Sequence, residues 1–390
     1  MQFHPFIVAM AAAAVTIASA QEAPLVVGTV VSQTGSQAAL AAGYRKGLLL
    51  WQDEVNAAGG VLGRTVELRL SDDRSEAARA GIAYAELIRD GAQLLIGPYG
   101  SAATLAAAAE ADRARRPMIN GAGASGRVYK RAQRYVFQTV APYSSYGQGV
   151  LELAKEAGCT SLYILARNDT ASTEMGDAAR EQALKLGLKP LDLEVYSGSD
   201  VDFAPLIAKA RSAKVDAWIA FGEARDAADM VRAMKRAAYA PRLFYARGAA
   251  EPKFIARVGQ DAEFTLASRA YDARSPTPGN EAFVKAYAAK WSADPDAAAA
   301  EGYAAGTVLA RAVERAGSLD PEKLRAALAG LETGTVLGTY KVAPSGEQIG
   351  IKPAVIQIRG GRATFLWPQA WRGAASFQPY AQWNERKIIR

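Results

Sequence analysis

Short apolar runs alternate with helical patterns of apolar residues along the first third of the chain. Residues 25–31 form a valine-rich run, and the segment after it carries Tyr44 and Leu48 at helical spacing until Gly59 and Gly60 end the pattern. Further strands are expected at 66–70, 94–96 and 118–119, and helices at 75–89 and after Ser101. Strands separated by helices in this order predict a parallel sheet with helices on both faces.

The same alternation restarts after residue 145 and predicts a second sheet. Its expected elements are helix 146–157, strand 162–165, helix 174–186, strand 191–196, helix 203–212, strand 217–221, helix 224–238 and strand 243–245. The segment "YDARSPTPGN" then interrupts the pattern, and helices at 281–291, 297–316 and 321–328 and strands at 354–358 and 363–367 follow it. We therefore predict an α/β protein with two doubly wound, parallel-sheet lobes.

The first 20 residues have the pattern of an export signal. Residues 6–17 are apolar, and Ala18-Ser19-Ala20 has the small-x-small form of a cleavage site. This apolar run is too short to span a membrane, and no other run in the sequence is longer. We expect a soluble periplasmic protein whose signal segment, residues 1–20, is cleaved near Ala20.

Histidine and cysteine usage excludes much catalytic chemistry. Beyond the expected signal the sequence has no histidine, and Cys159 is its one cysteine. A Ser-His-Asp triad, a Cys-His pair, the usual zinc ligand sets and an internal disulfide are therefore ruled out. Two-carboxylate or Ser-Lys catalysis stays open on composition, but no convincing pair is present. We expect no enzyme activity, no metal and no cofactor.

The charge pattern gives no sign of a nucleic-acid partner. The formal net charge is +7, but positive and negative side chains are mixed and scattered along the chain. No basic stripe with interleaved aromatic residues is present, so the charges indicate a solvated surface.

The stretch "LLIGPYGSAAT" at 94–104 is a candidate binding loop. An apolar strand runs into a turn and then into the start of a helix, where free backbone N–H groups and the positive dipole end attract anions. In open α/β sheets, ligands bind beyond the carboxyl ends of the strands, which is where this turn lies. Ser101 begins the helix and either holds a ligand or only caps the helix by bonding the N–H of Ala103 or Thr104.

An ordered set of motifs resembles type I periplasmic solute-binding proteins, in particular the leucine/isoleucine/valine-binding family of ABC transporters. The motifs are "TG" after the first strand, "NAAGGVLGR", "SDDRSEAA", "LIGPYGSAAT" and "YVFQTVAPYSSYGQG". The resemblance implies two lobes that close like a hinge on a small solute and deliver it to an inner-membrane ABC permease. Three crossovers are expected near 142, at 270–272 and at 343–350. We expect a monomer with residues 21–142 plus 272–343 in lobe 1 and 143–271 plus 344–390 in lobe 2.

The resemblance also assigns ligand-binding positions, several of which depart from the family pattern. Ser101 matches the serine that holds the ligand carboxylate, and the family's small-residue loop falls at 120–125, with its threonine at Ala124 beside Ser125. Two family tyrosines fall at Ser172 and Glu223, and the first-lobe aromatic anchor falls at Leu40. The acidic residue that neutralises the ligand's α-ammonium group falls at Arg247. The disulfide of some relatives is missing.

A guanidinium in place of that carboxylate reverses the charge beside the ligand. Arg247 would repel an ammonium and attract a carboxylate, and Tyr99, Tyr143 and Tyr146 would stack on a flat ligand. We therefore expect an organic acid, aromatic acids included, to be preferred to leucine. The predicted ligand-binding residues are Tyr99, Gly100, Ser101, Ala122, Gly123, Ala124, Ser125, Tyr143, Tyr146, Ser172, Glu223 and Arg247.

Alternatives stay open for the residues and for the function. Arg247 has a second interpretation as a partner of Glu223 or Glu251, and Tyr143 and Tyr146 as packing residues. A sensory ligand-binding subunit, a branched-chain amino-acid binder of the parent type, and an enzyme on a similar frame all remain as alternative functions.

Overall fold

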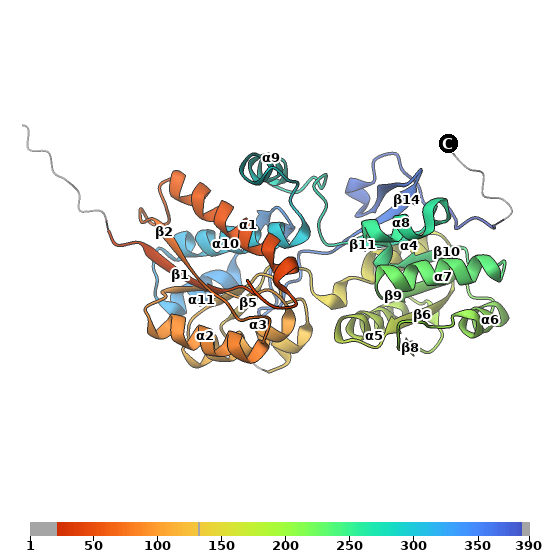
Figure 1. Cartoon of the computed structure of the whole chain (residues 1–390), viewed down its shortest axis with the longest axis horizontal. Helices are drawn as coiled ribbons and strands as arrows, with labels where there is room; N and C mark the ends of the chain where they lie inside the picture. The colour runs from red at the N-terminus through yellow and green to blue at the C-terminus, as the bar shows by residue number, and fades with distance from the viewer. Residues whose placement is uncertain (1–21, 132, 384–390) are drawn as a thin grey trace, which may run out of the picture.

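Two α/β lobes lie side by side in the computed structural model (Figure 1), which describes residues 22–131 and 133–383. The predicted signal segment lies outside the described residues. Within those ranges, no helix is long and apolar enough to cross a membrane.

The first lobe is built on a five-stranded sheet in the order β2-β1-β3-β4-β5, and each neighbouring pair of strands is parallel. The strands are β1 Leu25–Val30, β2 Val66–Ser71, β3 Leu94–Ile96, β4 Met118–Asn120 and β5 Val136–Gln138. The helices around it are α1 Ala38–Ala57, α2 Ala77–Arg89, α3 Ser101–Arg113, α10 Ala297–Ala316 and α11 Pro321–Gly330.

Alternation along β1 explains why helices cover both faces of this sheet. Leu25 and Val27 pack with α1, α10 and α11, whereas Val26 and Val30 pack with α2 and α3. Successive side chains of a strand point to opposite faces, so a fully apolar strand must be covered on both sides. The predicted doubly wound arrangement is confirmed for this lobe.

The second lobe is built on an eight-stranded sheet in the order β15-β14-β11-β10-β9-β6-β7, with β8 paired to β6. Its strands are β6 Ser161–Arg167, β7 Lys189–Pro190, β8 Glu194–Tyr196, β9 Ala217–Phe221, β10 Leu243–Ala246, β11 Leu266–Arg269, β14 Ala354–Arg359 and β15 Arg362–Trp367. Helices α4 Gln148–Glu156 and α5 Thr170–Lys185 cover one face, and α6 Ala204–Ser212, α7 Ala224–Arg236 and α8 Pro252–Val258 the other. Strand β14 pairs antiparallel with both β11 and β15, so the predicted parallel sheet is antiparallel at this one edge and parallel from β11 to β7 and β8.

The chain passes between the two sheets three times. It leaves the first sheet after β5, returns from β11 through α9 (Asn280–Trp291) to α10, and leaves again after the hairpin of β12 (Thr333–Thr335) and β13 (Gly338–Tyr340) to reach β14. These passages bracket the three predicted crossovers near 142, 270–272 and 343–350. The exact residue boundaries of the two lobes stay a prediction.

Candidate functional site

Ser101 is the first residue of α3, at the carboxyl end of β3. The turn before it needs Gly100, whose φ of 89° is unfavourable for a residue with a side chain. The Ser101 Oγ accepts a hydrogen bond from the backbone N–H of Ser125 over 3.2 Å. Among the described residues, it makes no bond to an N–H of its own helix, so the structure does not support the capping role.

The loop 121–125 follows β4 and is held against Ser101 by Asn120. The Asn120 side chain donates to the carbonyl of Gly123 and accepts from its N–H, both over 2.7 Å. A Cβ atom at Gly123 would lie 2.6 Å from Thr104 Oγ1, which explains the need for glycine. Ala122 pairs with Tyr99 through an isolated β-bridge. The seven predicted first-lobe residues, 99–101 and 122–125, therefore lie together.

Tyr143 and Tyr146 extend this group from the first crossover, where Tyr143 begins the short 3-10 helix η2 (Tyr143–Ser145). The Tyr143 N–H donates to the carbonyl of Ala124 over 2.9 Å, and its ring centre lies 6.2 Å from that of Tyr146. Burial raises the pKa of Tyr143, and a hydrogen bond with Ser101 opposes that rise. The tyrosine is therefore in contact with both first-lobe loops.

Arg247 approaches these tyrosines from the second lobe. It starts the 3-10 helix η3 (Arg247–Ala250) directly after β10 and is partly buried. Burial raises the pKa values of Tyr99, Tyr143 and Tyr146 above the ordinary value. The positive charge of Arg247 opposes this rise at each of the three tyrosines. No ion pair joins Arg247 to Glu223 or Glu251 in the described part of the chain, so the structure does not support that interpretation.

Ser172 and Glu223 have local partners instead. The Ser172 hydroxyl and N–H both donate to the Asp169 carboxylate, over 2.9 and 2.8 Å, at the start of α5. Glu223 is exposed and forms a capping box with Asp226 at the start of α7. Leu40, at the position of the family's aromatic anchor, is 57% exposed. Any ligand contact by Ser172 or Glu223 stays a prediction.

Sequence reasoning missed Glu174, which connects the two lobes. Its carboxylate, on α5 of the second lobe, accepts hydrogen bonds from the Ser125 hydroxyl at 2.7 Å and the Gly126 N–H at 3.2 Å. It also pairs with Arg127 Nε at 3.2 Å. These partners lie in the first lobe, far from Glu174 in the chain. No motif marks Glu174 in the sequence.

Glu301 was also missed, because "DAAAAEGYAA" reads only as a tightly packed helix. It lies on α10 and is partly buried, and the structure gives its carboxyl no hydrogen bond or ion pair within the described residues. Burial and the neighbouring Asp296 raise its pKa to about 8. Its charge raises the pKa of Tyr99, Tyr143 and Tyr146, the same tyrosines that Arg247 affects from the second lobe. We call Ser101, these three tyrosines, Arg247 and Glu301 the interlobe site.

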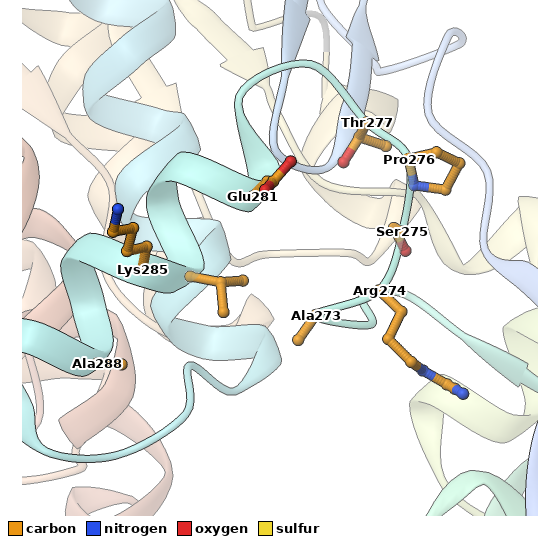
Figure 2. Close-up of a pocket in the computed structure, with 9 residues that line it drawn as sticks. Ala273, Arg274, Ser275, Pro276, Thr277, Glu281, Lys285 and Ala288 are labelled. Carbon is orange, nitrogen blue, oxygen red and sulfur yellow. The ribbon is translucent and has the colours of Figure 1, made fainter.

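A cavity of about 640 Å³ lies elsewhere, at the second crossover (Figure 2). It separates the segment 273–277 from α9, which contributes Glu281 and Lys285. Arg274 extends from this segment and pairs with Asp272 at 2.8 Å. None of the predicted ligand-binding residues lines this cavity.

Two doubly wound lobes, connected by three chain passages and with polar loops meeting between them, define a type I periplasmic binding protein. The sequence matches the family described as periplasmic binding protein over residues 24–362, and the chain belongs to this family. The resemblance found in the motifs is thereby confirmed.

Several relatives and solved structures are similar to this chain. A leucine-, isoleucine-, valine-, threonine- and alanine-binding protein of Pseudomonas aeruginosa is 25% identical over 288 residues, covering 73% of this chain and 76% of that protein. A leucine-binding protein of Thermotoga maritima has a TM-score of 0.71 and 25% identity, covering 89% of this chain and 99% of that one. A solute-binding protein of R. palustris in complex with benzoate has a TM-score of 0.68 at 21% identity, covering 92% and 97%.

Proposed function

We propose that this protein is the extracytoplasmic solute-binding component of an ABC importer and that it closes on a small carboxylate-bearing solute. Organic or aromatic acids are preferred to branched-chain amino acids. The observation that carries this proposal is Arg247, a cation that acts on the site tyrosines and has no ion-pair partner among the residues described. An unpaired guanidinium beside a ligand favours a carboxylate, which accepts two parallel N–H bonds from it.

The remaining groups of the interlobe site suit an acid with a flat body. The first turn of α3 supplies Ser101 and free backbone N–H groups, which favour a negative charge. Tyr99, Tyr143 and Tyr146 supply aromatic surface that stacks on a planar group. The R. palustris protein in complex with benzoate supports the idea that this fold accommodates such a ligand.

Two alternatives remain. The relatives named for leucine, isoleucine and valine favour a branched-chain amino-acid binder. A sensory subunit would have the same binding lobes and would pass its signal to a membrane kinase instead of a permease.

Location and partners complete the proposal. The protein is exported, and its signal segment is cleaved near Ala20. It works as a monomer that binds its ligand and delivers it to an inner-membrane permease. Its role is binding and not catalysis. N-terminal sequencing of protein released by osmotic shock should begin near Gln21. Uncleaved protein recovered from the cytoplasm would contradict this part of the proposal.

Calorimetric titration of the purified protein tests the ligand class. Wild type should bind benzoate or succinate more tightly than leucine, isoleucine or valine. Arg247→Glu should abolish acid binding because it places a negative charge against the ligand carboxylate, and its circular dichroism should stay that of the wild type. The matched control is Arg257→Glu, at an exposed position of α8 in the same lobe, which should bind as wild type does. Tight leucine binding with no response to the acids would instead support the amino-acid alternative.

A further inference from the structure

We propose that Glu301 is a second recognition residue of the interlobe site and that its carboxyl group donates a hydrogen bond to a carboxylate oxygen of the bound acid. This inference rests on the proposed function and deepens it, since it names a group that selects an acid over an amino acid. Arg247 then contacts the ligand from the second lobe and Glu301 from the first.

Close packing of two helices fixes Glu301 beside the binding loops. A Cβ atom at Gly302 would lie 2.3 Å from the carbonyl oxygen of Tyr44 on α1, and one at Gly47 would lie 2.0 Å from that of Ala299 on α10. The backbones of α1 and α10 therefore approach as closely as glycine allows. Glu301 precedes Gly302, so this contact fixes its backbone beside α1, and the charge of Glu301 acts on Tyr44.

Tyr44 in turn connects this place to the loop that carries Ser101. Its hydroxyl donates to the carbonyl of Gly97 over 2.8 Å, and its ring centre lies 6.1 Å from that of Tyr99. The negative charge of Glu301 raises the pKa of Tyr44 as well as those of the three site tyrosines. Glu301 therefore stands within electrostatic reach of each aromatic group in the site.

The surroundings of Glu301 favour its neutral form. The titratable groups with which it interacts electrostatically are Tyr44 from α1, Tyr99 from the loop after β3, Tyr143 and Tyr146 from the first crossover, and Asp296 at the start of α10. None of these is a cation, and Arg247 acts on the same tyrosines from the second lobe without forming an ion pair with Glu301 in the described ranges. With its pKa raised to about 8 by burial and by Asp296, most of the carboxyl is protonated at neutral pH.

A protonated carboxyl and a ligand carboxylate form a strong pair. The O–H···O⁻ bond is charge-assisted, so it is shorter and stronger than a bond between neutral groups. An ammonium group at the same place would lie beside the neutral Glu301 carboxyl, which is a hydrogen-bond donor and not an anion. Ionisation of Glu301 would remove the donor and repel the acid, so binding should weaken as pH rises through the pKa of Glu301. Burial raises the pKa values of the site tyrosines above the ordinary value, so they do not titrate in this range.

Calorimetric titration with benzoate and with succinate between pH 6.5 and 9 tests the proposal. Wild type should hold a steady affinity up to about pH 7 and lose roughly tenfold by pH 9, as a single proton with a pKa of about 8 requires. Glu301→Gln keeps a donor that does not titrate. It should bind about three- to tenfold more weakly than wild type at pH 7, because an amide N–H is a weaker donor than a carboxyl O–H, and its affinity should not change up to pH 9. Glu301→Leu, which has no donor, should bind still more weakly at every pH.

The matched control is Glu314→Gln, the same substitution at an exposed position of α10, which should keep the wild-type profile. A Glu301→Gln profile that still falls above pH 8, while Arg247→Glu abolishes acid binding, would overturn the role of Glu301 and leave the proposed function standing. If wild type binds leucine tightly and Glu301→Gln does not, then Glu301 pairs with the ammonium group of the ligand. That result would overturn its role as a hydrogen-bond donor. Wild type that binds neither acid at any pH would overturn the proposed function itself, and this inference with it.

Discussion

The Ser101 hydroxyl has a structural role, and we propose that it also takes part in ligand recognition. It accepts the N–H of Ser125 and interacts with Tyr143, so it joins the two first-lobe loops to the first crossover. The interaction with Ser125 uses only an oxygen lone pair, so the hydroxyl proton can be donated either to Tyr143 or, as we propose, to an acceptor oxygen of a ligand.

Ser101→Ala should therefore weaken ligand binding by about 1–2 kcal/mol, close to the range for a hydrogen bond to a charged group. Calorimetry on the tightest-binding acid measures this loss. Ser199→Ala, at an exposed position of the second lobe, is the control and should bind as wild type. An unchanged affinity in Ser101→Ala, with the ligand in the same place, would limit Ser101 to joining the loops.

At the same scale, the sequence identified Arg247 and Ser101 as candidate site residues but not Glu174 and Glu301. Ser101 follows a strand within a recognisable motif, and Arg247 became visible because it replaces an expected acid. Glu301 lies in an alanine-rich helix whose pattern predicts packing alone. Its place beside Tyr44 depends on the contact of α1 with α10, and no local pattern encodes a contact between helices so distant in the chain.

Elements differ in how far their own sequence determines them. The 20-residue helices α1 and α10 are long enough for the helical period to be plain, and both were predicted. Strands β5 and β11 have three and four residues and were missed, as was the seven-residue helix α8. Of the predicted strand at 191–196, only the last three residues form a strand, β8, and β7 lies just before the predicted range. Elements this short carry no measurable period, so their neighbours in the sheet help decide where they form, and β3, which is equally short, was predicted from its apolar run before a turn.

At the scale of elements, the contact between α1 and α10 positions Glu301. This contact predicts that alanine substitutions at two glycines, Gly302 and Gly81, change the stability of the protein differently. A methyl group at Gly302 would meet the Tyr44 carbonyl at 2.3 Å, so Gly302→Ala should force the helices apart and destabilise the protein by about 1–3 kcal/mol. Gly81→Ala on α2 is the matched control. Its nearest neighbour would lie at an ordinary 3.6 Å, so the better helix propensity of alanine should leave stability equal or higher. Thermal unfolding followed by circular dichroism compares the two, and equal melting temperatures would contradict the packing argument.

The whole molecule depends on how its two lobes meet. Glu174 accepts two hydrogen bonds and forms one ion pair across the gap between lobes, and its three partners lie at 125–127, where the loop that accompanies Ser101 ends. Contacts of this kind favour the arrangement in which the lobes approach each other. They also place the lobe-to-lobe connection beside the interlobe site, so we expect lobe approach and ligand contact to be coupled through the same loop.

Glu174→Ala should weaken ligand binding without touching the ligand. Removing the carboxylate deprives Ser125, Gly126 and Arg127 of their second-lobe partner, so the approached form becomes less populated. The apparent affinity falls by the same factor as the population of the binding-competent form. Small-angle X-ray scattering should show a larger radius of gyration for Glu174→Ala without ligand and a wild-type value once ligand saturates it. Asp177→Ala, at an exposed position of the same helix, should match wild type in both measurements. A Glu174→Ala protein with wild-type dimensions and affinity would mean that these contacts do not govern closure, and the ligand itself must then hold the lobes together.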